Sequence, residues 1–137
     1  MPASERNGSR QLAVAAARAA AEKNATDVIV LEVRDLIVIT DYFVIASGAS
    51  DRQVRTITDE VERVLAADGA KAIRREGQSG GRWVLLDFVD LVVHVFVEEE
   101  RDYYELERLW KDARRVRWQP RAKTPKGDTT ARPDKAG

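Results

Sequence analysis

The sequence predicts an α/β protein, a single layered domain with a mixed β-sheet flanked by helices. Three segments have the composition or apolar spacing of helices, and short runs rich in β-branched residues accompany them. The chain has 137 residues, of which 44% are hydrophobic, so it is long enough for one core and crowded for two. We expect a flexible N-terminus at residues 1–8, the domain at 9–117 and a disordered basic tail at 118–137.

Residues 9–23 predict the first helix, because they are rich in alanine, the best helix former, and are punctuated by charged residues. Ser9 is the expected N-cap and Asn24 the expected stop. The mostly alanine apolar face of this helix suits close packing. Residues 27–33 and 41–48 are rich in β-branched and aromatic residues, which predicts two strands.

The clearest element is a second helix over residues 50–69, with Ser50 as its N-cap and Gly69 as its stop. Its apolar residues recur at helical spacing and predict one buried face, made of Val54, Ile57, Val61, Val64 and Leu65. The apolar stretch at residues 36–40 is either a separate strand or part of a neighbouring one.

The most informative segment is the apolar run at residues 83–96, WVLLDFVDLVVHVF. It predicts two antiparallel strands joined through Val89 and Asp90, with partners whose residue numbers sum to 179. Because side chains alternate across a strand, one face of this hairpin is aliphatic and is expected to be core; it consists of Val84, Leu86, Val93 and Val95. The other face mixes apolar and polar groups and consists of Trp83, Leu85, Asp87, Val92, His94 and Phe96.

A short strand at residues 71–76 and a glycine-rich turn at 78–82 precede this hairpin, and a helix at 98–115 follows it. The last helix has acidic residues in its first turn and basic residues in its last turn, which matches the helix dipole. Tyr103 lies on the apolar stripe of this helix, which predicts packing on the sheet, whereas Tyr104 falls outside the stripe. The predicted element order is αββαβββα.

The charges divide the chain into an acidic part and a basic part. Residues 114–137 carry eight Lys/Arg and two Asp/Glu, a net charge of +6, and since the whole chain is neutral, residues 1–113 carry −6. A domain that binds nucleic acid through phosphates needs a basic face, so the acidic part is a poor candidate for that function. Acidic residues interleaved with aromatic ones at 98–110 are instead typical of a surface that anchors a basic protein partner.

The sequence lacks the residues that zinc proteins, membrane-spanning proteins and secreted proteins need. With no cysteine and one histidine, the chain has no set of zinc ligands, and we expect no metal and no cofactor. No apolar run reaches the roughly 18 residues that span a bilayer, and the polar N-terminus is unlike a secretion signal. We therefore expect a soluble, cytoplasmic protein with no membrane contact.

The turn from Gly48 to Ser50 is the feature that points toward nucleotide chemistry. It joins a strand to a helix, where backbone N–H groups can meet a phosphate, as in nucleotidyltransferase-like folds. Metal-dependent nucleotidyl transfer also needs closely placed carboxylates, commonly D-x-D, and that pattern is absent from the sequence. We interpret Ser50 as a helix cap and keep an active nucleotidyltransferase or nucleotide-binding protein as the alternative function.

His94, the single histidine, has two interpretations. It shares a strand face with Trp83 and Asp87, as a general base would, but no nucleophile or substrate groove is visible beside it. We favour a structural or interface histidine. No catalytic residue is predicted, and we expect a binding protein, not an enzyme.

Three segments closely resemble the ribosomal silencing factor family, also known as Iojap-related proteins: DYFVIASGASDRQV, WVLLDFVDLVVHVF and RDYYELERLW. The resemblance covers residues 13–113 in the same order. It implies a nucleotidyltransferase-like fold without the catalytic acids. It also implies binding to protein fourteen of the large ribosomal subunit where the small subunit docks, which blocks subunit joining and represses translation, typically under nutrient limitation. Organelle relatives imply a role in large-subunit assembly.

Given this resemblance, we expect the mixed face of the hairpin to dock the partner, with Trp83 as a rigid anchor and Asp87 as an acceptor for a basic side chain. The partner-binding residues are then Trp83, Leu85, Asp87, His94, Tyr103 and Tyr104. The alternative is that the last helix covers this face completely. A homodimer through an exposed edge or face, and a weak ribosomal RNA contact by the basic tail, are further expectations.

Overall fold

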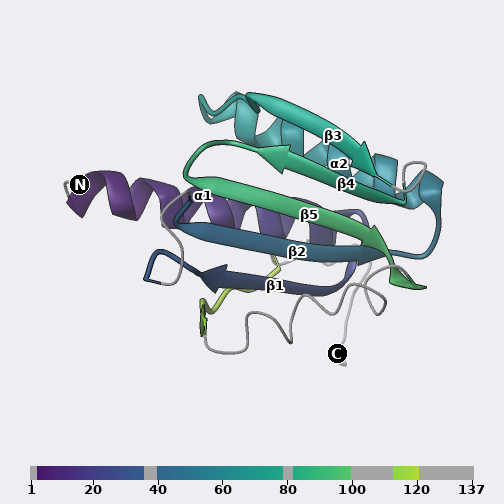
Figure 1. Cartoon of the computed structure of the whole chain (residues 1–137), viewed down its shortest axis with the longest axis horizontal. Helices are drawn as coiled ribbons and strands as arrows, with labels where there is room; N and C mark the ends of the chain where they lie inside the picture. Colours follow the sequence, from purple (N-terminus) through teal and green to yellow (C-terminus); the bar gives the residue numbers. More distant parts are fainter. Residues whose placement is uncertain (1–2, 36–39, 79–81, 100–112, 121–137) are drawn as a thin grey trace, which may run out of the picture.

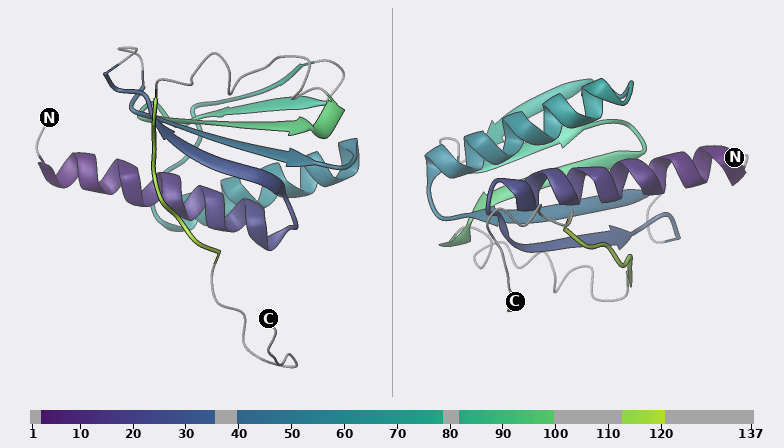
Figure 2. Two further views of the ribbon diagram at one scale, coloured as in Figure 1. Left: turned by 90° about the horizontal axis from the view of Figure 1, so that it is seen from below. Right: turned by 180° about the vertical axis from the view of Figure 1, so that it is seen from behind.

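The computed structural model describes residues 3–35, 40–78, 82–99 and 113–120 of the chain. In these residues two helices and six strands form two layers, with both helices on one face of the sheet (Figure 1, Figure 2). In chain order the elements are α1 (Ala3–Glu22), β1 (Thr26–Glu32), β2 (Tyr42–Gly48), α2 (Asp51–Ala67), β3 (Arg74–Gln78), β4 (Trp83–Asp87), β5 (Leu91–Val97) and β6 (Arg114–Arg115). The α/β class predicted from the sequence is confirmed.

The sheet has the strand order β3-β4-β5-β2-β1-β6. Its central pair, β2 and β5, is parallel, and the other neighbouring pairs are antiparallel. A parallel pair needs a crossover, which α2, β3 and β4 provide between β2 and β5. The sheet is therefore mixed, as predicted. The predicted register of the hairpin is also confirmed, since Val84 pairs with Val95 and Leu86 with Val93.

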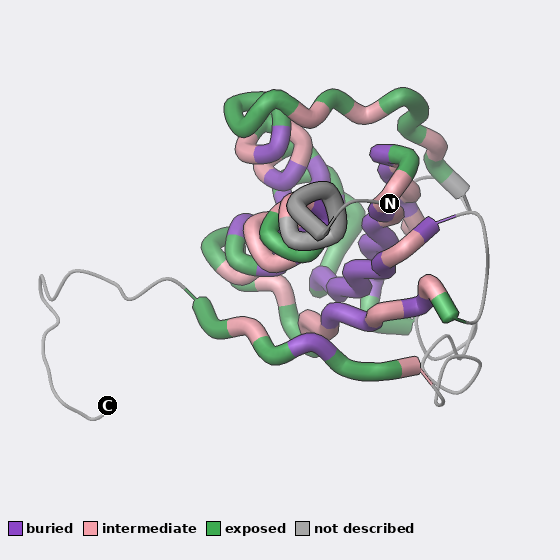
Figure 3. Tube along the Cα trace, turned by 90° about the vertical axis from the view of Figure 1, so that its left-hand side faces the viewer, coloured by how far each residue is buried: buried purple, intermediate pink, exposed green. Residues whose placement is uncertain are grey.

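The core lies between the helices and the sheet, where the tube in Figure 3 shows buried positions along the central strands. The predicted face of α2 is buried, and its fully covered apolar residues are Val54, Ile57, Val61 and Leu65. The part of α1 that packs on the core is made of small residues with no exposed surface, namely Ala13, Ala16, Ala17 and Ala20. Alanine allows α1 to approach both the sheet and α2 closely.

Three of the four ends predicted for the first two helices are confirmed. Ser50 caps α2, because its side chain accepts a hydrogen bond from the Gln53 N–H at 3.2 Å. Asn24 follows α1 with φ 66° and Gly69 follows α2 with φ 91°. Both residues thus take the left-handed conformation that commonly ends a helix.

The start of α1 differs from the prediction. The helix begins at Ala3, so Ser9 lies inside it, buried, and does not cap it. Residues 3–8, expected to be flexible, continue the helix. Gly8 is a weak helix former, but a nucleated helix extends through such a residue at a cost of about 1 kcal/mol.

The end of the predicted helix at residues 98–115 is also wrong. Arg114–Arg115 form β6, an edge strand paired with β1, and the Val116 N–H continues the pairing by donating to a β1 carbonyl at 2.8 Å. Local helical composition is overridden here by backbone pairing with a distant strand. Most of that helix, residues 100–112, lies outside the described residues, as does the apolar stretch at 36–39.

After β6 the chain crosses from the sheet edge to α1. The Trp118 indole N–H donates to the Val28 carbonyl at 3.2 Å, and Arg18 Nε donates to the Gln119 carbonyl at 2.9 Å. Trp118 also packs against the core between helices and sheet. Contacts with the domain therefore reach Gln119, so the predicted start of the disordered tail at residue 118 is too early. The predicted disorder of the remaining tail concerns residues 121–137, which are outside the described part.

Candidate docking face

The two faces of the sheet are covered differently. On the side of α1 and α2, the predicted aliphatic face of the hairpin is buried in the core. The opposite side, which we call the docking face, carries the mixed residues of the hairpin and a second apolar cluster. The buried members of this cluster are Leu31, Val33, Phe43, Ile45 and Phe96, and its half-buried members are Ile29, Trp83, Val92 and Ala113.

Trp83 is a half-buried aromatic residue held from two sides on the docking face. Its ring stacks on Phe96, its partner across the ladder, with centroids 4.9 Å apart and planes 24° from parallel. Its indole N–H donates to His94 Nδ1 at 3.3 Å. A ring that is both stacked and hydrogen-bonded has lost most of its rotamer freedom before any partner arrives.

His94 lies beneath this tryptophan and is 7% exposed. Its ring meets Phe43 edge-on at 5.0 Å. Because Nδ1 accepts the hydrogen bond from Trp83, the neutral ring carries its proton on Nε2, which has no hydrogen-bond partner among the described residues. Burial lowers the pKa of His94 from 6.5 to about 4, so the ring is neutral at physiological pH.

Asp87 ends β4 and organises the turn that follows. Its Oδ1 accepts the Val89 N–H at 2.9 Å, and its Oδ2 accepts from Arg74 Nη2 at 3.3 Å. Val89 has φ 77°, a left-handed conformation that is strained for a β-branched residue. The Arg74 side chain is 56% exposed, so its ion pair with Asp87 is weak, and the Asp87 side chain itself keeps 18% of its surface exposed.

The structure therefore brings four predicted site residues together on one face: Trp83, Leu85, Asp87 and His94. Burial separates their roles, because Trp83, Leu85 and Asp87 keep partial exposure whereas His94 is buried. Tyr103 and Tyr104 lie outside the described residues, as does most of the helix expected to cover this face.

Sequence reasoning missed part of this site. Phe43 and Ile45 belong to the docking face, and Arg74 reaches Asp87 from the neighbouring strand. Phe43 and Ile45 do alternate with Tyr42 and Val44 in the sequence, but their side can be assigned only once β2 is known to lie beside β5.

The turn from Gly48 to Ser50 lies at the end of β2, beside an open cleft of about 500 Å³. A Cβ at Gly48 would come within 3.2 Å of the Val54 backbone nitrogen, so glycine allows α2 to start close to the strand. Arg82 borders the cleft and pairs with Glu99 at 2.7 Å. Both turn residues thus have structural roles, and phosphate binding there stays a prediction.

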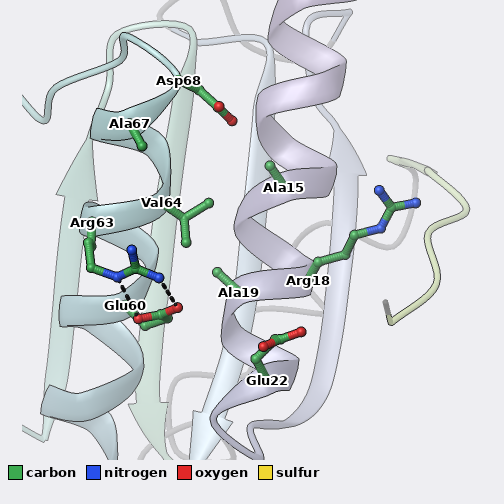
Figure 4. Close-up of a pocket in the computed structure, with 9 residues that line it drawn as sticks. All are labelled: Ala15, Arg18, Ala19, Glu22, Glu60, Arg63, Val64, Ala67 and Asp68. Atoms are coloured by element: carbon green, nitrogen blue, oxygen red, sulfur yellow. Dashed lines mark hydrogen bonds and ion pairs between the residues drawn. The ribbon is translucent and has the colours of Figure 1, made fainter. Parts of the chain in front are cut away.

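A second cleft, of about 220 Å³, lies between α1 and α2 (Figure 4). Arg63 holds Glu60 through two contacts of 3.0 and 2.7 Å, and this hydrogen bonding lowers the pKa of the Glu60 carboxyl. Arg18 points away from the cleft, toward the segment that contains Gln119. The lining has no pairing of a nucleophile with a base.

The described residues lack two further kinds of site or segment. They contain no group of three or more His, Cys, Asp or Glu side chains placed to hold a metal ion. Nor does any helix among them combine the length and apolarity needed to cross a membrane.

Comparisons of the sequence and of the structure with known proteins agree on one family. Residues 6–136 match a family described as "Ribosomal silencing factor during starvation". The ribosomal silencing factor of Bacillus subtilis is 43% identical over 98 residues, which is 72% of this chain and 83% of that protein. A Mus musculus protein named "Mitochondrial assembly of ribosomal large subunit protein 1" is 34% identical over 92 residues, 65% of this chain and 40% of that protein. A crystal structure from Chromobacterium violaceum has a TM-score of 0.71 and 31% identity, covering 82% of this chain and 89% of that one.

Proposed function

The chain belongs to the ribosomal silencing factor family, and from this premise we propose that it acts by binding, without catalysis. It docks on protein fourteen of the large ribosomal subunit, blocks association with the small subunit and so represses translation, typically under nutrient limitation. The observation that carries this proposal is the half-buried Trp83 on the docking face, which Phe96 and His94 hold in one orientation.

The docking face has the physical properties of a protein-binding hot spot. Tryptophan is enriched at such positions because it buries a large area at a low cost in rotamer entropy, and here much of that cost is met on folding. Leu85 and Val92 are half-buried and add apolar surface. Asp87 offers an acceptor for a basic side chain, and the net charge of −6 on residues 1–113 favours approach to a basic partner.

Blocking of subunit joining follows from size alone. A folded domain of this length has a radius of gyration of about 14 Å. A folded protein of that size on the joining surface keeps two rigid particles apart, so no chemical step is required. The name of the mouse relative, which refers to assembly of the ribosomal large subunit, supports this subunit as the target.

Three further features belong to the proposal. The protein acts in the cytoplasm, where translating ribosomes are found. It forms a homodimer when no ribosome is present, through β3, the strand at one edge of the sheet, which pairs only with β4 in the described part of the chain. The basic tail adds a weak contact with ribosomal RNA, because residues 121–137 carry five Lys/Arg and two Asp/Glu.

Sedimentation of the purified protein with ribosomal particles tests the proposal. We expect the protein to migrate with free large subunits and not with joined ribosomes, and to lower the yield of joined ribosomes when both subunits are mixed. Equal occupancy of free and joined particles would refute it. Pull-down with isolated protein fourteen then tests the named partner separately from the subunit.

Nucleotide binding at Gly48 and Ser50 is the competing function. It predicts metal-dependent binding of a nucleoside triphosphate at micromolar affinity. A calorimetric titration that shows such binding, together with no binding to large subunits, would favour it over the silencing role.

A further inference from the structure

The edge of the sheet at β6 is basic and firmly attached to the domain. Backbone pairing with β1 holds Arg114 and Arg115, and the Trp118 indole N–H donates to a carbonyl near the start of that strand at 3.2 Å. Val116 is buried between them. The backbone that carries these arginines is thus hydrogen-bonded to the sheet and is part of the folded domain.

Two of these arginines lie on the docking-face side of the sheet. Arg115 is opposite Leu31 in the ladder, and cross-strand partners share a face. Leu31 belongs to the same apolar cluster as Trp83. The next residue, Val116, packs in the core on the helix side, so alternation returns Arg117 to the side of Arg115.

Within the described part of the chain, no acidic side chain pairs with the arginines of this edge. Arg115 and Arg117 are exposed and form no ion pair with another described residue. They adjoin residues 1–113, a part of the chain with a net charge of −6. Guanidinium groups in this situation favour phosphate, which they bind through two parallel hydrogen bonds.

We propose that Arg115 and Arg117, which we call the arginine edge, bind the phosphate backbone of RNA on the particle that the docking face contacts. This inference rests on the proposed function. In the strand order, β6 is four strand spacings from β4, or about 19 Å. The docking face can thus rest on a ribosomal protein while the arginine edge reaches adjacent RNA.

An acidic protein surface is the competing partner for these arginines. Protein interfaces usually need a central apolar or aromatic anchor. The apolar residues of this segment, Val116 and Trp118, are turned into the domain and pack on its core. The edge thus presents positive charge without an exposed apolar side chain, which suits binding to the phosphates of an RNA backbone better than binding to a protein surface. Like charges at the edge also oppose pairing with the same edge of a second copy.

The test is the salt dependence of binding to purified large subunits. The double variant Arg115→Ala/Arg117→Ala should reduce the slope of log K against log salt by roughly 1.5 to 2, as expected for two lost phosphate contacts. The matched control is Arg52→Ala/Arg55→Ala, which removes the same charge from exposed positions of α2 and should leave the slope unchanged. If the alanine double variant does not fold, Arg117→Ala alone should reduce the slope by about 1.

Hydroxyl-radical footprinting of the RNA in the same complexes identifies the partner. The wild-type protein and the control variant should protect an RNA segment that the Arg115/Arg117 variant leaves exposed. An unchanged slope with an unchanged footprint refutes the arginine edge and leaves the proposed function intact. A reduced slope without any RNA footprint indicates an acidic protein and also refutes it. Failure of the wild-type protein to bind large subunits refutes the proposed function, and this inference with it.

Discussion

Truncation of Trp83 to alanine separates an interface residue from a core residue. The side chain is half-buried, stacks on Phe96 and donates to His94, so its removal affects the folded domain as well as the docking face. A residue that serves only the core would reduce binding solely by reducing the amount of folded protein. The two contributions must therefore be measured on the same preparation.

The magnitudes follow from the burial. A fully buried tryptophan costs about 3 to 5 kcal/mol on truncation to alanine, and the half-buried Trp83 should cost the fold roughly 2 kcal/mol. As an interface anchor it should cost at least about 2 kcal/mol of binding free energy, or about thirtyfold in Kd. The binding loss is counted per folded molecule and is additional to the loss of stability.

Trp118→Ala is the matched control. Trp118 is also half-buried and also donates its indole N–H, at 3.2 Å, but it packs on the helix side. Both variants should lower the midpoint of urea unfolding, whereas Trp83→Ala should weaken co-sedimentation with large subunits much more, because Trp118 only supports the arginine edge and is not itself an anchor. Similar binding losses in the two variants, each in proportion to the unfolded fraction, would show that Trp83 is not an anchor.

Four further outcomes can be measured with the same assays. Asp87→Asn keeps an acceptor for the Val89 N–H, so it should melt almost as the wild type while its complex weakens and becomes less sensitive to salt; unchanged binding would remove Asp87 from the interface. Val89→Gly should stabilise the fold by about 1 kcal/mol, because removing the backbone strain of a β-branched residue in the left-handed conformation outweighs the larger chain entropy that glycine loses on folding. The Val89 side chain is 52% exposed, so little packing is lost. A lower melting temperature would contradict this. The pKa of His94 falls to about 4 on folding, so below pH 6.5 the unfolded state takes up the proton first, and stability should fall by roughly 3 kcal/mol between pH 6.5 and 4. His94→Leu should lack that part of the decline in urea unfolding curves, and an equal decline in both proteins would refute the assignment. Deletion of residues 120–137 should leave cooperative melting intact, whereas deletion from Val116 should not, since Val116 is buried.

The sequence was sufficient for the elements whose geometry is local. The register of the hairpin follows from two-residue alternation and one short turn, and both are visible in residues 83–96. The buried face of α2 follows from helical spacing, and its ends from Ser50 and Gly69. Because alternation also fixes faces, the grouping of Trp83 with Asp87 needed no tertiary information.

Long-range pairing was not predictable in this way. Strands β2 and β5 are neighbours in the sheet although a helix and two strands separate them in the sequence. No local sequence pattern predicts this pairing. The same reason explains why Phe43 was not assigned to the docking face and why Arg114–Arg115 were assigned to a helix. The hydrogen bond from Trp83 to His94 depends on two rotamers, which alternation leaves open.

The role of the His94 imidazole is to hold the Trp83 indole in place. A buried donor without a partner, as Nε2–H is among the described residues, costs about 1 to 3 kcal/mol, and an apolar residue of similar volume would avoid that cost. Such a residue would also leave the Trp83 indole without its acceptor and free to rotate. The imidazole thus costs stability beneath the docking face and fixes the orientation of the half-buried tryptophan there. The entropic cost of binding falls when the anchor side chain is already ordered in the free protein. A histidine at position 94 therefore favours binding affinity at the expense of folding stability.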